Sequence, residues 1–255
     1  MCARYWLMAL LALPLSAVAA EYVPLSGASF ASVVPLEADG APVDVAPFRL
    51  RTLPVTNAEF LAFVHANPEW RRDRVAPILA DSRYLSHWSS PEELGDDAAA
   101  RQPVTRVSWF AAQAYCASEG ARLPTWHEWE YAAAADADRH DARSDPAWRE
   151  NILAWYARPS NVPLPDVGGA ANAYGVRDLH GLVWEWVDDY NALLVASDSR
   201  DQDDPDVLKF CGAGALSLQE KENFAVLMRV AMLSSLHAAG TTNNMGFRCA
   251  KPVAE

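Results

Sequence analysis

The chain has 255 residues, 51% of them hydrophobic, and a formal net charge of −12 at pH 7. That length allows one large domain or two small ones. An acidic surface repels nucleic acid and anionic lipid headgroups, and no basic cluster interrupts it, so neither is expected as a partner.

The first twenty residues predict an export signal. "MCAR" contributes one positive charge, "YWLMALLALPL" is apolar, and "SAVAA" supplies small residues at its end. The apolar run is short for a membrane span, and Cys2 precedes it, whereas a lipoprotein needs a cysteine after it. We expect cleavage after Ala20 or Ala19, leaving residues 21–255 as a periplasmic or secreted protein of charge −13 without its signal arginine. An uncleaved membrane anchor is the alternative.

Three cysteines remain after such cleavage: Cys116, Cys211 and Cys249. In an oxidising compartment, an odd number suggests one disulfide and one free thiol. Composition alone does not say which two residues pair.

The first half of the chain predicts short strands and then helices. Extended pieces broken by Gly, Pro and Asp are expected over residues 21–50. A helix follows Thr56, which forms a capping-box pattern with Glu59. A short helix is predicted at "SPEELG", with Ser90 as its N-cap and Glu93 completing the box.

Two further helices are predicted in the middle of the chain. The first follows the extended segment "TRVS", is capped by Ser108 and ends near Gly120. The second repeats the capping-box pattern with Thr125 and Glu128. Residues 136–172 are predicted to form a surface connection in which "ILAWYA" touches the core.

The last third of the chain predicts strands. "LVWEWV" would place Trp184 and Trp186 on one face of a strand, and both "FAVLMRVAMLSSL" and "MGFRCA" are expected as core strands. The acidic run "SDSRDQDDPD" is most simply a solvated loop. The predicted helices lie in the middle of the chain and the strands at both ends, without the regular alternation of βαβ units. This order indicates a single α+β domain with much irregular structure.

Glu185 stands between two tryptophans in "LVWEWV" and raises a chemical question. A buried carboxylate costs free energy unless it is neutralised, hydrogen-bonded or bound to a cation. The sequence pattern alone does not say which of these applies.

Four segments in this order resemble the formylglycine-generating enzyme (sulfatase-modifying factor) family. They are "PVTNAEFLAFV", "QPVTRVSWFAAQAYCASEGARLPTWHEWEYAAAA", "NAYGVRDLHGLVWEWV" and "MGFRCA", and together they cover nearly all of residues 23–252. The resemblance implies the family fold, a variant of the C-type-lectin-like architecture with little regular secondary structure, over residues 21–255.

The resemblance implies a calcium site at the segment that contains Glu185. The ligands carried over are the side chains of Asp178 and Glu185 and the backbone carbonyls of Gly181 and Val183. Calcium prefers such a mixture of oxygen ligands. The alternative is a carboxylate satisfied by backbone N–H groups and tryptophan indoles.

A second calcium site of the family would need an Asn-Ile pair and a downstream aspartate. The candidates here are Asn151, Ile152 and Asp166. The resemblance also implies a disulfide between Cys116 and Cys249.

The sequence departs from the family at its catalytic cysteines. The family's enzymes bind copper(I) with two cysteines, but Ser217 stands where the first is expected and no cysteine follows before Cys249. Soft copper(I) needs thiolate, thioether or imidazole ligands, so the oxidase chemistry of the named enzymes is not expected.

A different redox site could use residues in and after the same stretch. Cys211, Ser217 and His237 are the candidate catalytic residues, and His180 is the other histidine near the family motifs. A cysteine with Met228, Met232 and Met245 would suit copper(I), and iron is also considered. The alternative is that these methionines fill the core and Cys211 is a small buried hydrophobe.

Two functions follow from this pattern. The first is an exported maturation or oxidoreductase-like factor that acts on a periplasmic protein or small molecule without the cysteine pair. The second is a non-catalytic, calcium-stabilised module of lectin-like fold that binds a ligand or protein. Fold alone does not distinguish them, because function depends on the site.

Overall fold

The computed structural model describes residues 20–34, 41–159, 162–191 and 224–253. The predicted signal segment, apart from Ala20, and the acidic run lie outside these ranges. Within the described ranges, every helix is too short or too polar to cross a bilayer. The helices and strands in chain order are β1 (Tyr22–Leu25), β2 (Ala28–Phe30), β3 (Val43–Val45), β4 (Phe48–Arg51), α1 (Asn57–Ala66), the 3₁₀-helix η1 (Pro68–Trp70), α2 (Trp109–Ser118), α3 (Trp126–Ala133), α4 (Pro146–Tyr156), β5 (Trp184–Glu185), α5 (Phe224–Ser234), β6 (Met245–Gly246) and β7 (Ala250–Pro252).

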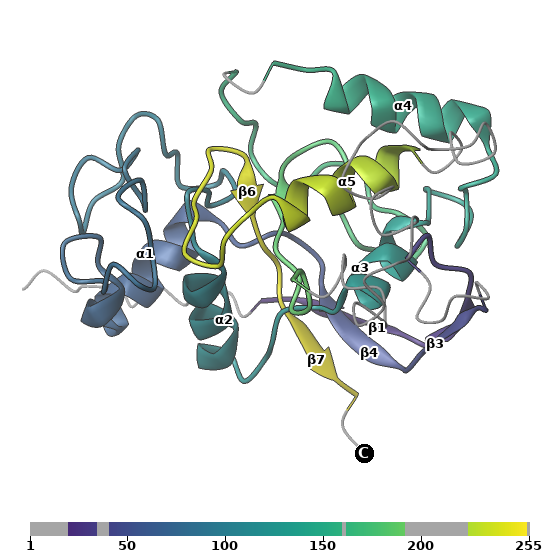
Figure 1. Cartoon of the computed structure of the whole chain (residues 1–255), viewed down its shortest axis with the longest axis horizontal. Helices are drawn as coiled ribbons and strands as arrows, with labels where there is room; N and C mark the ends of the chain where they lie inside the picture. The colour runs from purple at the N-terminus through teal and green to yellow at the C-terminus, as the bar shows by residue number, and fades with distance from the viewer. Residues whose placement is uncertain (1–19, 35–40, 160–161, 192–223, 254–255) are drawn as a thin grey trace, which may run out of the picture.

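The main sheet brings the two ends of the described chain together. Its antiparallel order is β1-β4-β7, so β4 pairs with an N-terminal strand on one side and a C-terminal strand on the other. Leu25, Phe48 and Leu50 of this sheet are fully buried. The extended pieces predicted for residues 21–50 are therefore confirmed as β1–β4, and they form the base of the core (Figure 1).

The three capped helices are confirmed. Thr56 caps α1 in a complete capping box with Glu59, and Thr125 does the same for α3 with Glu128. Ser108 caps α2 through the backbone N–H of Ala111. Each cap satisfies amide groups that the first turn of a helix leaves without partners.

The helix predicted at "SPEELG" is wrong. Ser90 and Glu93 exchange backbone hydrogen bonds across a tight turn. In addition, the Ser89 hydroxyl donates to the carbonyls of Glu93 and Leu94 at 3.2 and 2.8 Å. Such local side-chain bonds compete with helix formation.

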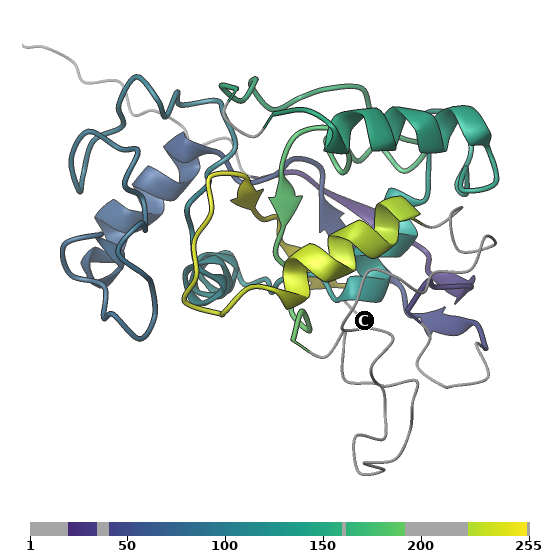
Figure 2. The same cartoon turned by 45° about the horizontal axis from the view of Figure 1, so that its top comes forward.

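Two helices replace the predicted connection and strand. Helix α4 lies inside the stretch expected to be an irregular connection, and its N-cap is Asp145, whose carboxylate accepts from Ala147 N. Helix α5 forms from the apolar run expected as a strand. A short apolar run does not distinguish a buried strand from a buried helix by periodicity. Figures 1 and 2 show α4 and α5 side by side on one face of the molecule.

The pairing of Cys116 with Cys249 is confirmed. The disulfide joins α2 to the segment just before β7, with the two Cα atoms 5.5 Å apart and 133 residues of separation along the chain. Both residues are fully buried among Phe60, Tyr115 and Phe247, whose rings contact one another. The disulfide therefore fixes the C-terminal strand to the aromatic core.

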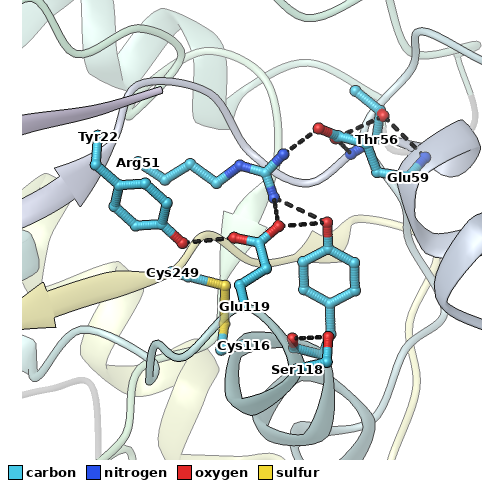
Figure 3. A network of polar contacts seen from close by, with 9 residues as sticks. Tyr22, Arg51, Thr56, Glu59, Cys116, Ser118, Glu119 and Cys249 are labelled. Carbon is cyan, nitrogen blue, oxygen red and sulfur yellow. Dashed lines mark hydrogen bonds and ion pairs between the residues drawn. A yellow bond between two sulfur atoms is a disulfide. The ribbon is translucent and has the colours of Figure 1, made fainter. Parts of the chain in front are cut away.

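A polar network lies beside this disulfide (Figure 3). The buried Arg51 guanidinium pairs with Glu59 of the α1 capping box and, at 3.2 Å, with Glu119. Glu119 also accepts from the hydroxyls of Tyr22 at 2.6 Å and Tyr115 at 2.8 Å. Arg51 has carboxylates on two sides, so its buried charge is compensated.

Removal of the disulfide is expected to destabilise the protein strongly. For residues 21–255, Cys116→Ser should lower the free energy of unfolding by about 4–5 kcal/mol, because the disulfide closes a long loop in the unfolded chain. Urea unfolding followed by tryptophan fluorescence measures this change. Thiol titration in denaturant should rise from one free thiol to two, and a decrease to zero would show that Cys211 and Cys249 form the disulfide instead.

A second buried feature lies where the loop before α2 meets the loop after η1. Leu85 and Arg106 both have positive φ, 48° and 53°, and Leu85 N donates to Arg106 O at 3.0 Å. His87, beside them, has no hydrogen-bond partner for either ring nitrogen. Burial, followed by the nearby charge of Arg106, lowers the pKa of His87 to about 4.

His87 should therefore make stability depend on pH. The unfolded chain binds a proton near the usual histidine pKa of about 6.5, whereas the folded protein does so only near pH 4. Stability is then fully present above about pH 6.5 and decreases as the pH falls toward 4. Thermal melts from pH 7 to 4 should show a shallower decrease for His87→Leu than for the wild type, whereas the exposed control His140→Gln should follow the wild type. Equal slopes for His87→Leu and the wild type would contradict this assignment.

Candidate functional site

The buried Glu185 is neutralised by an arginine. Strand β5 pairs in parallel with β6, and this pairing directs Glu185 into the core with none of its surface exposed. The guanidinium of Arg248 binds both carboxylate oxygens, Nε to Oε2 and Nη2 to Oε1, each at 2.8 Å. The indole of Trp129 donates to Oε2, also at 2.8 Å. A buried carboxylate with a bidentate arginine and an indole donor has its charge and hydrogen bonds satisfied.

The tryptophans on either side of Glu185 have different environments. Trp186 is fully buried, and its indole donates to the carbonyl of Val107 at 3.0 Å. Trp184 is half-buried, and its ring stacks on Tyr156 of α4 with centroids 4.8 Å apart. The ordered strand here is only the two residues of β5, shorter than predicted.

A second arginine, Arg229 of α5, lies against the same centre. Its guanidinium carbon is 3.4 Å from the centroid of the Trp129 ring, and its Nη2 donates to the backbone carbonyl of Glu185 at 2.6 Å. Only 1% of Arg229 is exposed, and none of the described residues gives its Nε a hydrogen-bond partner. Burial lowers the pKa of Arg229 to about 10, which still leaves it charged at neutral pH.

His180 lies between two tryptophans next to this centre. Its ring makes edge-to-face contacts with Trp129 and Trp148, each with centroids 5.5 Å apart. Nε2 lies 2.9 Å from the carbonyl of Ala133, and the buried Nδ1 has no partner. Burial lowers the pKa of His180 to about 4, so the imidazole is neutral at pH 7, with Nε2 as the donor to the carbonyl.

Two hollows lie beside α4. The smaller, of about 290 Å³, has Trp148, Asn151, Asn172, Asp178 and His180 in its wall. The larger, of about 500 Å³, is called the aromatic cleft here and is lined by Trp155, Tyr156, Leu182, Trp184, Met232 and Asn244, with Arg158 and several prolines. Both share Trp155, Arg158 and Gly181, so they are adjacent.

The structure gives the two side chains predicted to bind calcium other partners. Asp178 has φ 61° and accepts from the backbone N–H groups of Gly168 and Gly169 at 2.7 and 3.0 Å. Glu185 is held by Arg248 and Trp129. Gly181 lines both hollows and Val183 is fully buried. A calcium ion would have to compete with Arg248 for Glu185, so calcium at these residues stays a prediction.

The second set of predicted calcium ligands is divided between a helix and a loop. Asn151 and the buried Ile152 belong to α4, whereas Asp166 is exposed and forms an ion pair with Arg101 at 3.2 Å. No group of three or more His, Cys, Asp or Glu side chains suited to a metal occurs within the described ranges. This second site also stays a prediction.

The candidate redox residues are only partly placed. Cys211 and Ser217 lie outside the described residues. His237 is exposed after α5, and its carbonyl accepts from Gly240 N at 2.7 Å. The three methionines have different environments: Met228 is 41% exposed, Met232 lines the aromatic cleft and Met245 is buried in β6.

Sequence reasoning missed both buried arginines. Arg229 lies inside "FAVLMRVAML" and Arg248 inside "MGFRCA". A lone arginine in an otherwise apolar segment is a usable signal, because a buried charge requires a partner. Trp129 was also missed, since its indole reaches Glu185 across 56 residues of sequence.

These features define an α+β domain with little regular structure, a buried Glu-Arg pair and an aromatic cleft at its edge. The model of the sulfatase-modifying factor enzyme 1-like domain matches residues 19–253, so the chain belongs to this family. Its fold is the formylglycine-generating-enzyme fold in a single domain.

Three comparisons place the chain among its relatives. It is 30% identical over 254 residues to the formylglycine-generating enzyme of Streptomyces coelicolor, covering 82% of this chain and 79% of that enzyme. It is 34% identical over 163 residues to the hercynine oxygenase of Mycobacterium tuberculosis, covering 56% of this chain but only 38% of that relative. The solved structure of PvdO from Pseudomonas aeruginosa aligns with a TM-score of 0.47 and 22% identity, over 91% of this chain and 94% of that one.

Breaking the buried ion pair is expected to be costly. Glu185→Gln leaves Arg248 charged and unpaired in the core, and should lower the free energy of unfolding by about 3–5 kcal/mol. The control Asp166→Asn removes the exposed partner of Arg101 and should change it by less than about 1 kcal/mol. Urea titrations measure both variants, and equal effects would contradict the central role of Glu185.

Melting curves of the wild type with calcium or with chelator test the calcium prediction. Equal melting temperatures under the two conditions would contradict it.

Proposed function

We propose that the chain is an exported, oxidoreductase-like maturation factor that acts on a periplasmic protein or small molecule. Family membership and relatives named formylglycine-generating enzyme and hercynine oxygenase support the oxidoreductase-like class. The chain spans little more than a third of the hercynine oxygenase that it matches, so that relative's activity and substrate are not transferred.

The aromatic cleft carries this proposal. It lies between α4 and the β5–β6 pair and includes Met232 of α5. A concave, largely apolar surface with a few polar groups is typical of ligand sites. In sequence, α5 follows directly after the segment with Cys211 and Ser217, which resembles the catalytic segment of the family.

The chemistry must differ from that of the named enzymes. Ser217 occupies the position of the first catalytic cysteine, so cysteine-to-formylglycine oxidation with a cysteine pair is not proposed. Cys211, with His237 and the thioether of Met232, offers ligands that suit copper(I), and iron is the other metal considered. Such a metal would supply electron transfer, and the cleft residues would bind and orient the substrate.

A non-catalytic binding module is the second candidate. The aromatic cleft and the Glu185–Arg248 pair are complete with protein groups alone. A ligand- or protein-binding role, with calcium as a stabilising ion, needs no redox group.

Elemental analysis separates these two functions. Residues 21–255 should be exported, purified without chelator and offered copper, iron and calcium. We expect stoichiometric copper or iron that is lost in Cys211→Ser, because the thiolate would be the strongest ligand. The exposed control His65→Gln should keep the metal, and circular dichroism should show that both variants are folded. Binding of neither copper nor iron would contradict the redox proposal, and calcium alone would favour the binding module.

A further inference from the structure

Among the residues that the structure describes, the buried centre formed by Glu185, Arg229 and Arg248 has one more positive charge than negative. Glu185 and Arg248 neutralise each other, with neither side chain exposed. Arg229 adds a second guanidinium, and its contacts among the described residues are the Glu185 carbonyl and the face of Trp129. A carbonyl and an aromatic face attract a cation without neutralising it.

This arrangement differs from that of the other arginines buried in the described core. Arg51 has two carboxylates, and every nitrogen of the Arg248 guanidinium has an acceptor. Within the described part of the chain, the buried Nε of Arg229 has no hydrogen-bond partner. A buried charge of this kind is costly unless an anion binds it.

Arg229 does not line the aromatic cleft itself but lies next to residues that do. Met232 follows it by three residues on α5, so both are on the same face of that helix, and Met232 lines the cleft. The carbonyl that Arg229 contacts belongs to the residue after Trp184, another wall residue. Tyr156 is another wall residue near Arg229: burial raises the pKa of its phenol, and the positive charge of Arg229 lowers that pKa by a smaller amount.

The cleft itself favours a flat apolar group. The rings of Trp155, Tyr156 and Trp184 contact one another with centroids 4.8 to 5.6 Å apart. Leu182, Met232 and several prolines extend this apolar surface. Arg158 also lines the cleft and is exposed, so it is a second cation that must be distinguished from Arg229.

We propose that the aromatic cleft binds a ligand with a flat apolar body and a carboxylate. The body packs on Trp155, Tyr156 and Trp184, and the carboxylate pairs with Arg229 next to these residues. The inference rests on the proposed function in one respect, because both take the aromatic cleft as the ligand site. It adds the chemical class of the substrate or ligand.

Phenylacetate and its neutral amide, phenylacetamide, are matched probes for this inference. Titrations of residues 21–255, followed by tryptophan fluorescence and calorimetry, should show that the carboxylate binds more tightly by about tenfold or more, as expected for a charge-assisted hydrogen bond. Arg229→Gln should remove this preference and leave amide binding within about threefold of the wild type. Arg229→Lys should keep part of the preference, since it keeps the charge.

Arg158→Gln is the control for the exposed cation. It should change the preference by no more than about twofold, because an exposed pair is weak. The inference would be overturned if the two probes bind equally or if neither binds. It would also be overturned if the preference for the carboxylate persists in Arg229→Gln or disappears in Arg158→Gln. Near-ultraviolet circular dichroism checks the fold of each variant, and Arg229→Lys decides the outcome if Arg229→Gln is unfolded. Binding is measured without turnover, so absence of redox activity would contradict only the proposed function.

Discussion

The bidentate pair between Glu185 and Arg248 holds together segments that lie far apart in the sequence. Arg248 also donates to the backbone carbonyls of Arg51, Thr52 and Arg177 at 2.8 to 3.2 Å. One side chain therefore connects the end of β4, the loop before β5, and β5 itself to the C-terminal segment. With so little regular secondary structure, such long-range side-chain bonds replace the ladders that order larger sheets.

The residue next to Arg248 fixes the opposite side of the same segment. Cys249 is bonded to Cys116 of α2, and the network of Arg51, Glu59 and Glu119 lies beside that disulfide (Figure 3). Arg248 and Cys249 lie between β6 and β7, and their side chains have partners in different parts of the core. The side chain of Arg248 therefore belongs to the ionic centre near the aromatic cleft, and that of Cys249 belongs to the aromatic core that contains the disulfide.

Local signals in the sequence predicted the helix caps, because Thr56, Ser108 and Thr125 act on amides within three residues. The disulfide followed from the resemblance alone. The partner of Glu185 could not be predicted locally, since Arg248 lies 63 residues away. Helix α5 was mistaken for a strand because its apolar run fits both periods, and α4 was missed because only Ile152 of its residues is buried. Cys211 and Ser217 lie outside the described residues, so the sequence remains the only basis for their roles.

The position of β4 between β1 and β7 has a consequence for how the chain folds. The central strand of the main sheet has a partner close to it in sequence, but its other partner lies some two hundred residues away, at Ala250–Pro252. Native contacts between residues so far apart in sequence are slow to form. During synthesis the sheet, the ionic centre and the disulfide all stay incomplete until Arg248, Cys249 and β7 have been made. Closure of the main sheet by β7 is therefore a late step in the folding of this domain.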